Sequence, residues 1–304
     1  MKRRDFLKRG LSVGFVAGTA FTINPYKNLI ASPLASDYDM VAIRGGEADS
    51  MFDRAIEEMG GMRKFVTKGQ TVVVKPNIGW DASPERAANT NPALIKRIIQ
   101  HCFNAGAKDV YVFDHTCNEW SKCYTNSQIE AAAKDAGAKV VMGNSEKYYQ
   151  NVTFQGGKVM KDAKIHELIL SSDVFINVPV LKNHGGANMT ITMKNLMGIV
   201  WDRKFWHAND LNQCIADFPL YRKPDLNIVD AYRVMKRNGP RGVSNDDVIT
   251  MKAQLITTDM VAADTAACKL FGKDPDEVKY IAMAEQLGVG TSDLSKLNIS
   301  RIKV

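Results

Sequence analysis

Short runs of β-branched residues alternate with helical segments along most of the chain. Strands are expected at residues 71–75, 109–114, 138–142, 173–180, 226–230 and 253–259. Apolar residues spaced three and four apart predict helices at residues 50–60, 91–105, 127–136 and 261–271. Such alternation is typical of a mainly parallel sheet with helices on both faces. The pattern therefore predicts an α/β fold.

The helix expected at 91–105 has the clearest local signals. Asn91 is suited to cap its N-terminus, and Pro92 fits the first turn, where no backbone N–H is needed. Leu94, Ile98 and Cys102 then repeat at helical spacing and predict a buried face. Further along, the Asn-Gly-Pro content of residues 236–242 predicts a turn.

Residues 1–36 follow a different pattern. Arg3 and Arg4 form a twin-arginine pair, and an apolar run of 13 residues follows, too short to span a bilayer, which needs about 20. This segment predicts a twin-arginine signal peptide, cleaved near Ser36 or alternatively near Ala31. A short basic helix is the alternative. The signal implies delivery to the periplasm by the twin-arginine export machinery, without a stable membrane anchor, and leaves residues 37–304 as a single α/β domain.

The net charge of +7 does not indicate a nucleic-acid partner. Residues 1–36 hold six of the 40 basic residues and one of the 33 acidic residues. The remaining chain, with 34 basic and 32 acidic residues, is close to neutral. A domain with so little excess charge lacks the basic footprint of a nucleic-acid-binding protein.

The five cysteines do not form a metal-binding motif. No two of them have the C-x2-C spacing, so we expect no cysteine-ligated iron–sulfur cluster and no structural zinc site. Cys117 and Cys123 are the only close pair and predict at most one disulfide in an oxidising compartment. Cys102 and Cys268 fall in helical apolar patterns, so we expect them to be reduced and buried.

Polar side chains stand at the ends of four predicted strands. These residues are Lys75, Asn77, Asp114, His115, Lys182, Asn183, His184 and Asp230. Each has an ordinary interpretation by itself, as a solvated strand end or as part of a turn. The carboxyl ends of parallel strands meet at one edge of a sheet, however, and ligands bind there. Together the residues predict one polar pocket.

The segment after Gly185 and Gly186 is apolar and adds a second Lys-Asn pair at Lys194-Asn195. Its apolar residues at helical spacing are Met189, Met193, Leu196, Met197 and Val200. They favour a helix, although the threonines also fit a strand. A helix that begins just after the two glycines would direct free N–H groups and a positive dipole at an anion. Thr190 and Lys194 would share one face of it, and Lys182 would lie on the other side of the anion.

Several stretches of the chain resemble domain-of-unknown-function family 362. They are "VVVKPN", "INVPVLKNHGGANMTITMKNLMGIV", "DLNIVDAYRVMKRNGPRG" and "LITTDMVAADTAACKLFG", and the resemblance runs from about residue 71 to residue 290. It implies an α/β domain whose members are often exported and sometimes carry a ferredoxin-type iron–sulfur module. This chain lacks the cysteines of that module. The family resemblance implies no particular activity.

The candidate site residues point first to an enzyme acting on an anionic small molecule, with or without a divalent metal. Catalytic roles are predicted for Lys75, Asp114 and His184. Ligand-binding roles are predicted for Asn77, Lys182, Asn183, Thr190, Lys194 and Asn195. Metal ligation is predicted for His184, His207 and Asp230, with Asp114 and Asp217 as alternative carboxylates.

Two other function classes stay open. A redox-accessory or electron-transfer protein is suggested by the export route and by relatives with cluster modules. A non-catalytic protein that binds an anion or a metal uses the same polar residues. The stretch "WDRKFWHAND" at 201–210 follows the second Lys-Asn pair and predicts either a lid over the pocket or a packed aromatic corner.

Overall fold

The computed structural model describes residues 38–304. The predicted export signal at residues 1–36 lies outside this part of the chain. The main sheet runs in the order β12 (Ile299–Lys303), β1 (Met40–Arg44), β11 (Val248–Thr257), β10 (Leu226–Met235), β7 (Val174–Val178), β2 (Thr71–Pro76), β3 (Asp109–Val112), β4 (Lys139–Val140). Two further strands, β8 (Val180–His184) and β9 (Asn188–Thr190), extend it beside β10.

Most neighbouring strands in this sheet are parallel, as the sequence predicts. The parallel pairs run from β4 through β3, β2 and β7 to β10, and β1 is parallel to β12. Strand β11 is antiparallel to both of its neighbours. The predicted turn at 236–242 lies between β10 and β11, and no crossover helix intervenes, so the chain reverses direction.

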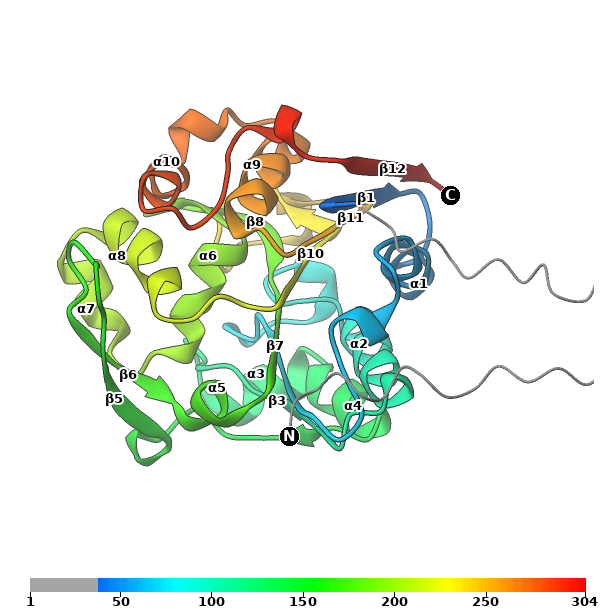
Figure 1. Ribbon diagram of the computed structural model, residues 1–304, viewed down its shortest axis with the longest axis horizontal. Helices are drawn as coiled ribbons and strands as arrows, with labels where there is room; N and C mark the ends of the chain where they lie inside the picture. Colours follow the sequence, from blue (N-terminus) through cyan, green and yellow to red (C-terminus); the bar gives the residue numbers. More distant parts are fainter. Residues whose placement is uncertain (1–37) are drawn as a thin grey trace, which may run out of the picture. The chain divides into compact units, whose positions relative to one another are not determined.

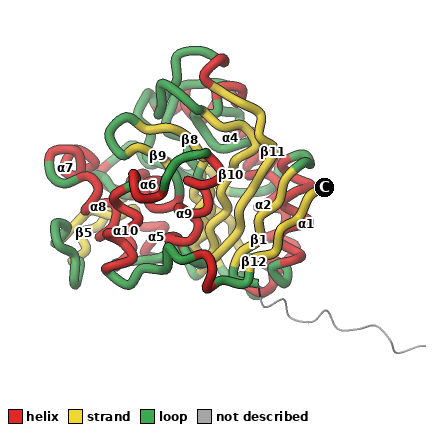
Figure 2. Tube along the Cα trace, turned by 90° about the horizontal axis from the view of Figure 1, so that it is seen from above, coloured by secondary structure: helices red, strands yellow, loops and turns green. Residues whose placement is uncertain are grey.

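Helices cover both faces of the sheet (Figures 1 and 2). One face packs against α1 (Ala48–Glu58), α2 (Pro92–Ala105), α3 (Trp120–Asn126) and α4 (Ile129–Asp135). The other packs against α5 (Glu167–Ser171), α6 (Thr192–Asn195), α7 (Arg203–Ala208), α8 (Leu211–Asp217), α9 (Met260–Phe271) and α10 (Lys279–Gln286).

Strand β2 shows why the sheet needs two helical layers. Val72 and Val74 belong to the core on the first face, and Val73 belongs to the core on the second. Successive side chains of a strand point to opposite faces, so a continuous apolar run requires burial on both sides. The predicted α/β fold with helices on both faces is therefore confirmed. None of the helices in residues 38–304 combines the length and apolar character that crossing a membrane requires.

Local signals in helix α2 act as expected. The Asn91 side chain accepts a hydrogen bond from the Ala93 N–H at 2.9 Å. Gly106 ends the helix in a left-handed conformation, with φ of 106°. The apolar stripe is buried, including Cys102, and Cys268 on α9 is buried as well.

Some predicted elements have different limits. The strand expected at 173–180 is two strands, β7 and β8, separated at Pro179. A short antiparallel pair, β5 (Tyr149–Thr153) and β6 (Asp162–His166), forms a second sheet that the sequence pattern did not predict. Its strand β5 carries exposed polar residues such as Gln150 and Asn151, so it lacks an apolar signal.

The segment after Gly185 and Gly186 does not begin as a helix. It returns as strand β9, which pairs antiparallel with β8, and helix α6 begins only at Thr192. The free N–H groups of α6 are already bound. Those of Thr192 and Met193 donate to the buried carboxylate of Asp264, at 2.7 and 3.2 Å. The expectation that the N-terminus of this helix binds an external anion is wrong, because its N–H groups already donate to an internal carboxylate.

Candidate anion-binding pocket

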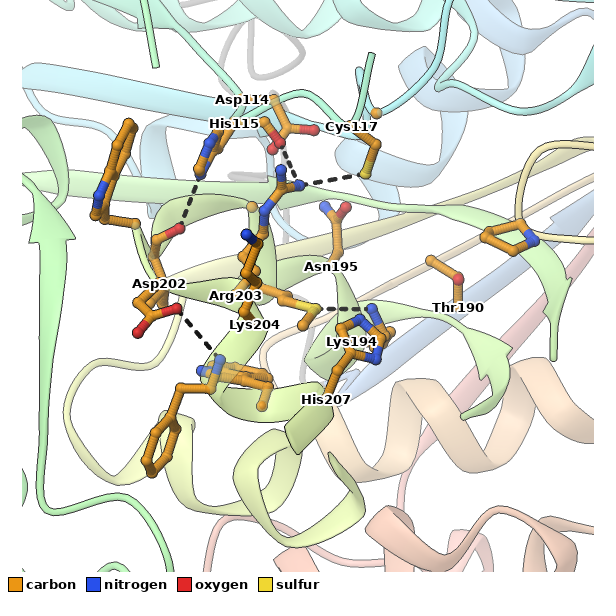
Figure 3. A pocket seen from close by; sticks show the side chains of 18 of the residues that line it. Asp114, His115, Cys117, Thr190, Lys194, Asn195, Asp202, Arg203, Lys204 and His207 are labelled. Carbon is orange, nitrogen blue, oxygen red and sulfur yellow. Dashed lines mark hydrogen bonds between the residues drawn. The ribbon is translucent and has the colours of Figure 1, made fainter. Parts of the chain in front are cut away.

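A cavity of about 1020 Å³ opens where β2, β3 and β8 end (Figure 3). Its walls also include the β8–β9 hairpin, α6 and the segment around α7. The predicted residues that line it are Lys75, Asn77, Asp114, Lys182, His184, Thr190, Lys194, Asn195 and His207. The sheet brings them together from distant parts of the chain, as the carboxyl edge of parallel strands is expected to do.

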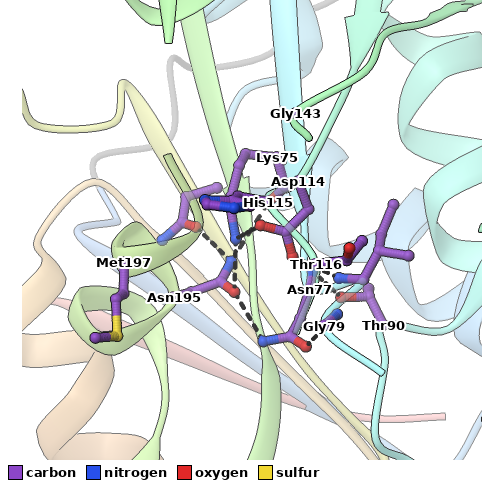
Figure 4. Close-up of polar contacts among 12 residues, drawn as sticks. Lys75, Asn77, Gly79, Thr90, Asp114, His115, Thr116, Gly143, Asn195 and Met197 are labelled. Atoms are coloured by element: carbon purple, nitrogen blue, oxygen red, sulfur yellow. Dashed lines mark hydrogen bonds and ion pairs between the residues drawn. The ribbon is translucent and has the colours of Figure 1, made fainter. Parts of the chain in front are cut away.

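Lys75 and Asp114 form a buried ion pair in the floor of this cavity. Lys75 Nζ lies 2.9 Å from Asp114 Oδ1, and each side chain is at most 3% exposed. The second carboxylate oxygen accepts the Ile78 N–H at 2.7 Å (Figure 4). Burial lowers the pKa of Lys75, and the Asp114 carboxylate opposes that effect. The pair ties β2 to β3, and its charges are already matched.

Asn195 connects helix α6 to the strands through a hydrogen-bond network (Figure 4). Its side-chain oxygen accepts from Lys75 Nζ and from Asn77 Nδ2, both at 3.0 Å. Its Nδ2 donates to Asn177 Oδ1 at 2.9 Å on β7. This network fixes α6, and with it Lys194, relative to the sheet.

Lys182 and Lys194 are buried but have no carboxylate partner among residues 38–304. Lys182 is 1% exposed, and its Nζ donates to the Ala88 carbonyl and to Asn77 Oδ1. Lys194 is 8% exposed, and its Nζ donates to the thioether of Met197 at 3.1 Å. A thioether sulfur is a weak acceptor. Both ammonium groups therefore keep an unmatched charge.

Burial without a carboxylate partner lowers the pKa of each lysine. Burial, reinforced by the nearby Lys194 and opposed by Cys117, lowers the pKa of Lys182 to about 7. Burial also lowers the pKa of Lys194 to about 8, with Arg203 adding to the effect and Cys117 opposing it. Near neutral pH, Lys182 is thus present in both its amine and its ammonium form.

Arg203 adds a third cation that the sequence pattern did not single out. It is the first residue of α7, and its guanidinium bridges to the loop after β3. Its Nη1 donates to the His115 carbonyl at 2.9 Å, and its Nη2 donates to the Thr116 carbonyl at 2.6 Å. No carboxylate of the described chain pairs with it. The stretch at 201–210 was interpreted as a lid or aromatic corner, and it forms one wall of the cavity.

The histidines of the cavity are held in defined protonation states. His184 Nδ1 accepts the N–H groups of Gly186 and Ala187, at 3.1 and 3.0 Å, so its Nε2 carries the proton. Burial and the charges of Lys194 and Lys182 lower the pKa of His184 to about 3. His184 can donate a hydrogen bond at neutral pH, but it is a poor proton acceptor. His207 is exposed at the rim.

Three predicted residues lie elsewhere. Asn183 Oδ1 accepts the Gly239 N–H at 3.0 Å, outside the cavity. The Asp230 carboxylate accepts the Asn91 N–H at the start of α2 and the Tyr232 N–H on its own strand, at 2.8 and 3.0 Å. Asp217 accepts from Val159 and Met160, at 2.7 and 2.9 Å. All three side chains stabilise backbone turns.

The proposed metal set is therefore wrong in its geometry. Asp230 and Asp217 do not reach the cavity, and His184 Nδ1 is already engaged. Within residues 38–304, no three His, Cys, Asp or Glu side chains are grouped so as to hold a metal ion. The site is built from cations and amides, which suit an anion better than a metal cation.

At most one disulfide was expected, between Cys117 and Cys123, and both cysteines are free in the structure. Cys117 is exposed in the cavity wall, where its Sγ lies 3.3 Å from Arg203 Nη1. Cys123 is carried into the core by helix α3, and its Sγ contacts the Gly79 carbonyl at 3.8 Å.

Comparison with known proteins identifies the family. Residues 72–269 match the family described as Domain of unknown function (DUF362). The chain belongs to this family. A DUF362 relative by sequence is the thylakoid-associated protein sll1697 of Synechocystis sp. It is 27% identical over 248 residues, which cover 77% of this chain and 73% of that protein.

Two solved structures are similar to this chain at low sequence identity. The lactate racemase apoprotein from Thermoanaerobacterium thermosaccharolyticum is 12% identical over 78% of this chain, with a TM-score of 0.48. A protein from Thermotoga maritima is 9% identical over 79% of this chain, with a TM-score of 0.41. The DUF362 chain spans 58% of the length of each of these two proteins.

Proposed function

We propose that this DUF362 protein is an enzyme that binds a small organic anion in the cavity and transfers a proton to or from it. The observation that carries the proposal is the group of three cations, Lys182, Lys194 and Arg203, that enter one cavity without a carboxylate partner. Leaving an ammonium buried and unpaired is costly, so such an arrangement is expected where a ligand supplies the missing charge.

The three cations and His184 have different roles in binding the anion and in transferring the proton. Lys194 holds the anionic group, the His184 Nε2–H donates a hydrogen bond to it, and Arg203 adds a fixed positive charge on the α7 wall of the cavity. Lys182 is the proton carrier, because an amine with a pKa of about 7 exchanges protons readily at neutral pH. Lys75 and Asp114, predicted as catalytic from the sequence, are assigned here to holding the floor of the site, since each neutralises the other.

Anion-dependent stabilisation tests the binding step. Melting curves of the wild type are expected to shift upward with phosphate, citrate or lactate, because a ligand that binds the folded state stabilises it. Lys194→Met is expected to leave the stability of the free protein nearly unchanged, or to raise it, and to abolish the shift. The comparison variant is Lys75→Met. It is expected to lower the free energy of unfolding by about 3–5 kcal/mol, since it leaves Asp114 buried without a partner.

A second measurement on the same proteins separates an enzyme from a protein that only binds. In heavy water, proton transfer replaces a C–H group of lactate or citrate by C–D, which proton spectroscopy detects. Lys182→Met is expected to stop this exchange while anions still raise the melting temperature. Binding without exchange in the wild type would favour the non-catalytic alternative. A large stability loss in free Lys194→Met, with no anion effect on the wild type, would refute the pocket.

A further inference from the structure

The positive charge of the cavity exceeds what its own carboxylates neutralise. The carboxylates of the described lining are Asp114, Glu146, Asp162 and Asp202. Asp114 is paired with Lys75, and Glu146 is paired with Lys164. Asp202 caps α7 by accepting the Phe205 N–H at 3.2 Å. Asp162 is exposed on β6. None of the four is bonded to Lys182, Lys194 or Arg203.

These three cations are anchored on different walls. Lys182 comes from β8 and is fixed to the Ala88 carbonyl in the loop between β2 and α2. Arg203 comes from α7 and is fixed to the loop after β3 through two carbonyls. Lys194 comes from α6, and its charge acts on the groups of both walls. Figure 3 shows Lys194 and Arg203 directed into the same cavity.

The cations are held by separate parts of the chain. The Arg203 guanidinium donates to two carbonyls of the loop after β3, and Lys182 Nζ donates to the Ala88 carbonyl, so moving either cation toward the other would break these hydrogen bonds. A cavity of about 1020 Å³ also has room for far more than one carboxylate. One anionic group would leave at least one of the fixed cations without a counter-charge.

We infer that the ligand carries two anionic groups, one bound between Lys182 and Lys194 and the other bound by Arg203. The chemical class is a short organic dianion such as a dicarboxylate. This inference rests on the proposed function, because it names the substrate class of the same pocket. A dianion would place one anionic group at the two lysines and one at Arg203 without any movement of β8 or α7.

The lysine protonation states support this assignment. In the free protein, burial holds Lys182 near half protonation at neutral pH. A bound dianion favours the ammonium form of Lys182 and Lys194, so binding is expected to take up protons from the buffer. A singly charged ligand between the two lysines would take up fewer, because it leaves uncompensated the Arg203 charge that lowers the pKa of Lys194.

Calorimetric titration with matched acids tests the inference. Succinate is compared with propionate, and malate with lactate, at constant ionic strength in buffers of different ionisation enthalpy. We expect each dianion to bind at least about tenfold more tightly than its matched monoanion, as one extra charge-assisted contact would give, and to take up more protons. Arg203→Met is expected to reduce the dianion affinity to the monoanion level while leaving monoanion binding unchanged.

Two further variants keep the test decisive. Arg203→Lys keeps the charge and serves if Arg203→Met fails to fold. It is expected to retain part of the dianion preference. Lys122→Met removes an exposed charge outside the cavity and is expected to change the dianion preference less than twofold, as a screened surface charge would. If Lys122→Met weakens dianion binding as much as Arg203→Met, diffuse charge and not a subsite is responsible.

The outcomes separate the two proposals. Equal affinity for monoanions and dianions, or equal weakening of both by Arg203→Met, would overturn the dianion inference and leave the anion pocket standing. Absence of binding for every acid tested would overturn the proposed function itself.

Discussion

Lysine side chains occupy two chemically different positions in the cavity. Lys75 has a carboxylate 2.9 Å from its nitrogen, whereas Lys182 has only a carbonyl and an amide oxygen. The ammonium of Lys75 is compensated inside the protein, and that of Lys182 is not. Two lysines near the ends of strands β2 and β8 thus serve different purposes, one in holding the fold and one in meeting a ligand.

This difference predicts how stability depends on pH. The folded protein lowers the pKa of Lys182 from 10.5 to about 7, so between these values the unfolded chain binds more protons than the folded one. Stability therefore rises with pH across this window, through Lys182, by about 2–4 kcal/mol. Lys182→Met is expected to remove that rise. Urea unfolding of both proteins between about pH 6 and 10, without anions, measures it, and an unchanged slope would contradict it.

At the residue scale, site residues at the ends of strands were easier to predict from the sequence than site residues that reach the cavity from helices. Lys75, Asp114 and Lys182 follow apolar runs directly, so their place at the sheet edge could be predicted. Arg203 bonds to the His115 carbonyl, 88 residues away in the sequence. No local pattern records such a contact, because it depends on where α7 packs. Asp230 also comes at the end of an apolar run, but its carboxylate accepts backbone N–H groups and does not line the cavity.

At the scale of elements, the segment that carries Lys194 shows why apolar spacing can mislead. Its stripe of methionine and leucine fits a helix from 189 to 200, yet residues 188–190 form β9. The residues between Met189 and Leu196, including Thr190, Thr192 and Lys194, are also buried. A segment enclosed on all sides needs no polar face, so its periodicity does not decide between strand and helix.

Helix α6 is instead positioned by a carboxylate from another helix. Asp264 on α9 is fully buried and accepts the N–H groups of Thr192 and Met193. It also accepts the Thr192 hydroxyl. Burial raises the pKa of Asp264 to about 7, although these hydrogen bonds oppose the shift. Asp264 therefore acts on the pocket only through α6, which carries Lys194 and Asn195.

Asp264→Ala is expected to lower the free energy of unfolding by about 1–3 kcal/mol, because it leaves buried N–H groups without a partner. It is also expected to reduce the anion-induced rise in melting temperature, since α6 would no longer hold Lys194 in place. Asp274→Ala is the matched control. Asp274 caps a short helical turn by accepting the Asp276 N–H at 3.1 Å, but it lies outside the cavity. Its loss is expected to leave the anion effect intact. Equal anion effects in wild type and Asp264→Ala would argue against the positioning role.

At the scale of the whole molecule, the parallel part of the sheet was predicted and the antiparallel direction of β11 was not. Strands β2 and β3 are parallel neighbours joined by a helical crossover, α2, with a distinct apolar period. The loop between β10 and β11 holds the predicted turn at 236–242, but the antiparallel pairing of β11 was not deduced from it. The cavity lies on the parallel side of the sheet, so its strand-end residues were predictable although its α7 wall was not.

The charge distribution along the whole chain leads to the export prediction. Six basic residues and one acidic residue lie in residues 1–36, and Arg3 and Arg4 stand together before the apolar run. The twin-arginine route moves chains that have already folded, which suits a domain whose cavity lysines are buried by distant segments of the chain.

Arg3→Lys with Arg4→Lys keeps the charge but removes the arginine pair. We expect this double variant to accumulate as uncleaved precursor in the cytoplasm, measured by fractionation and immunoblotting. Arg9→Lys, the same change outside the pair, is expected to be exported normally. Undiminished periplasmic protein from the double variant would show that the segment is not a twin-arginine signal.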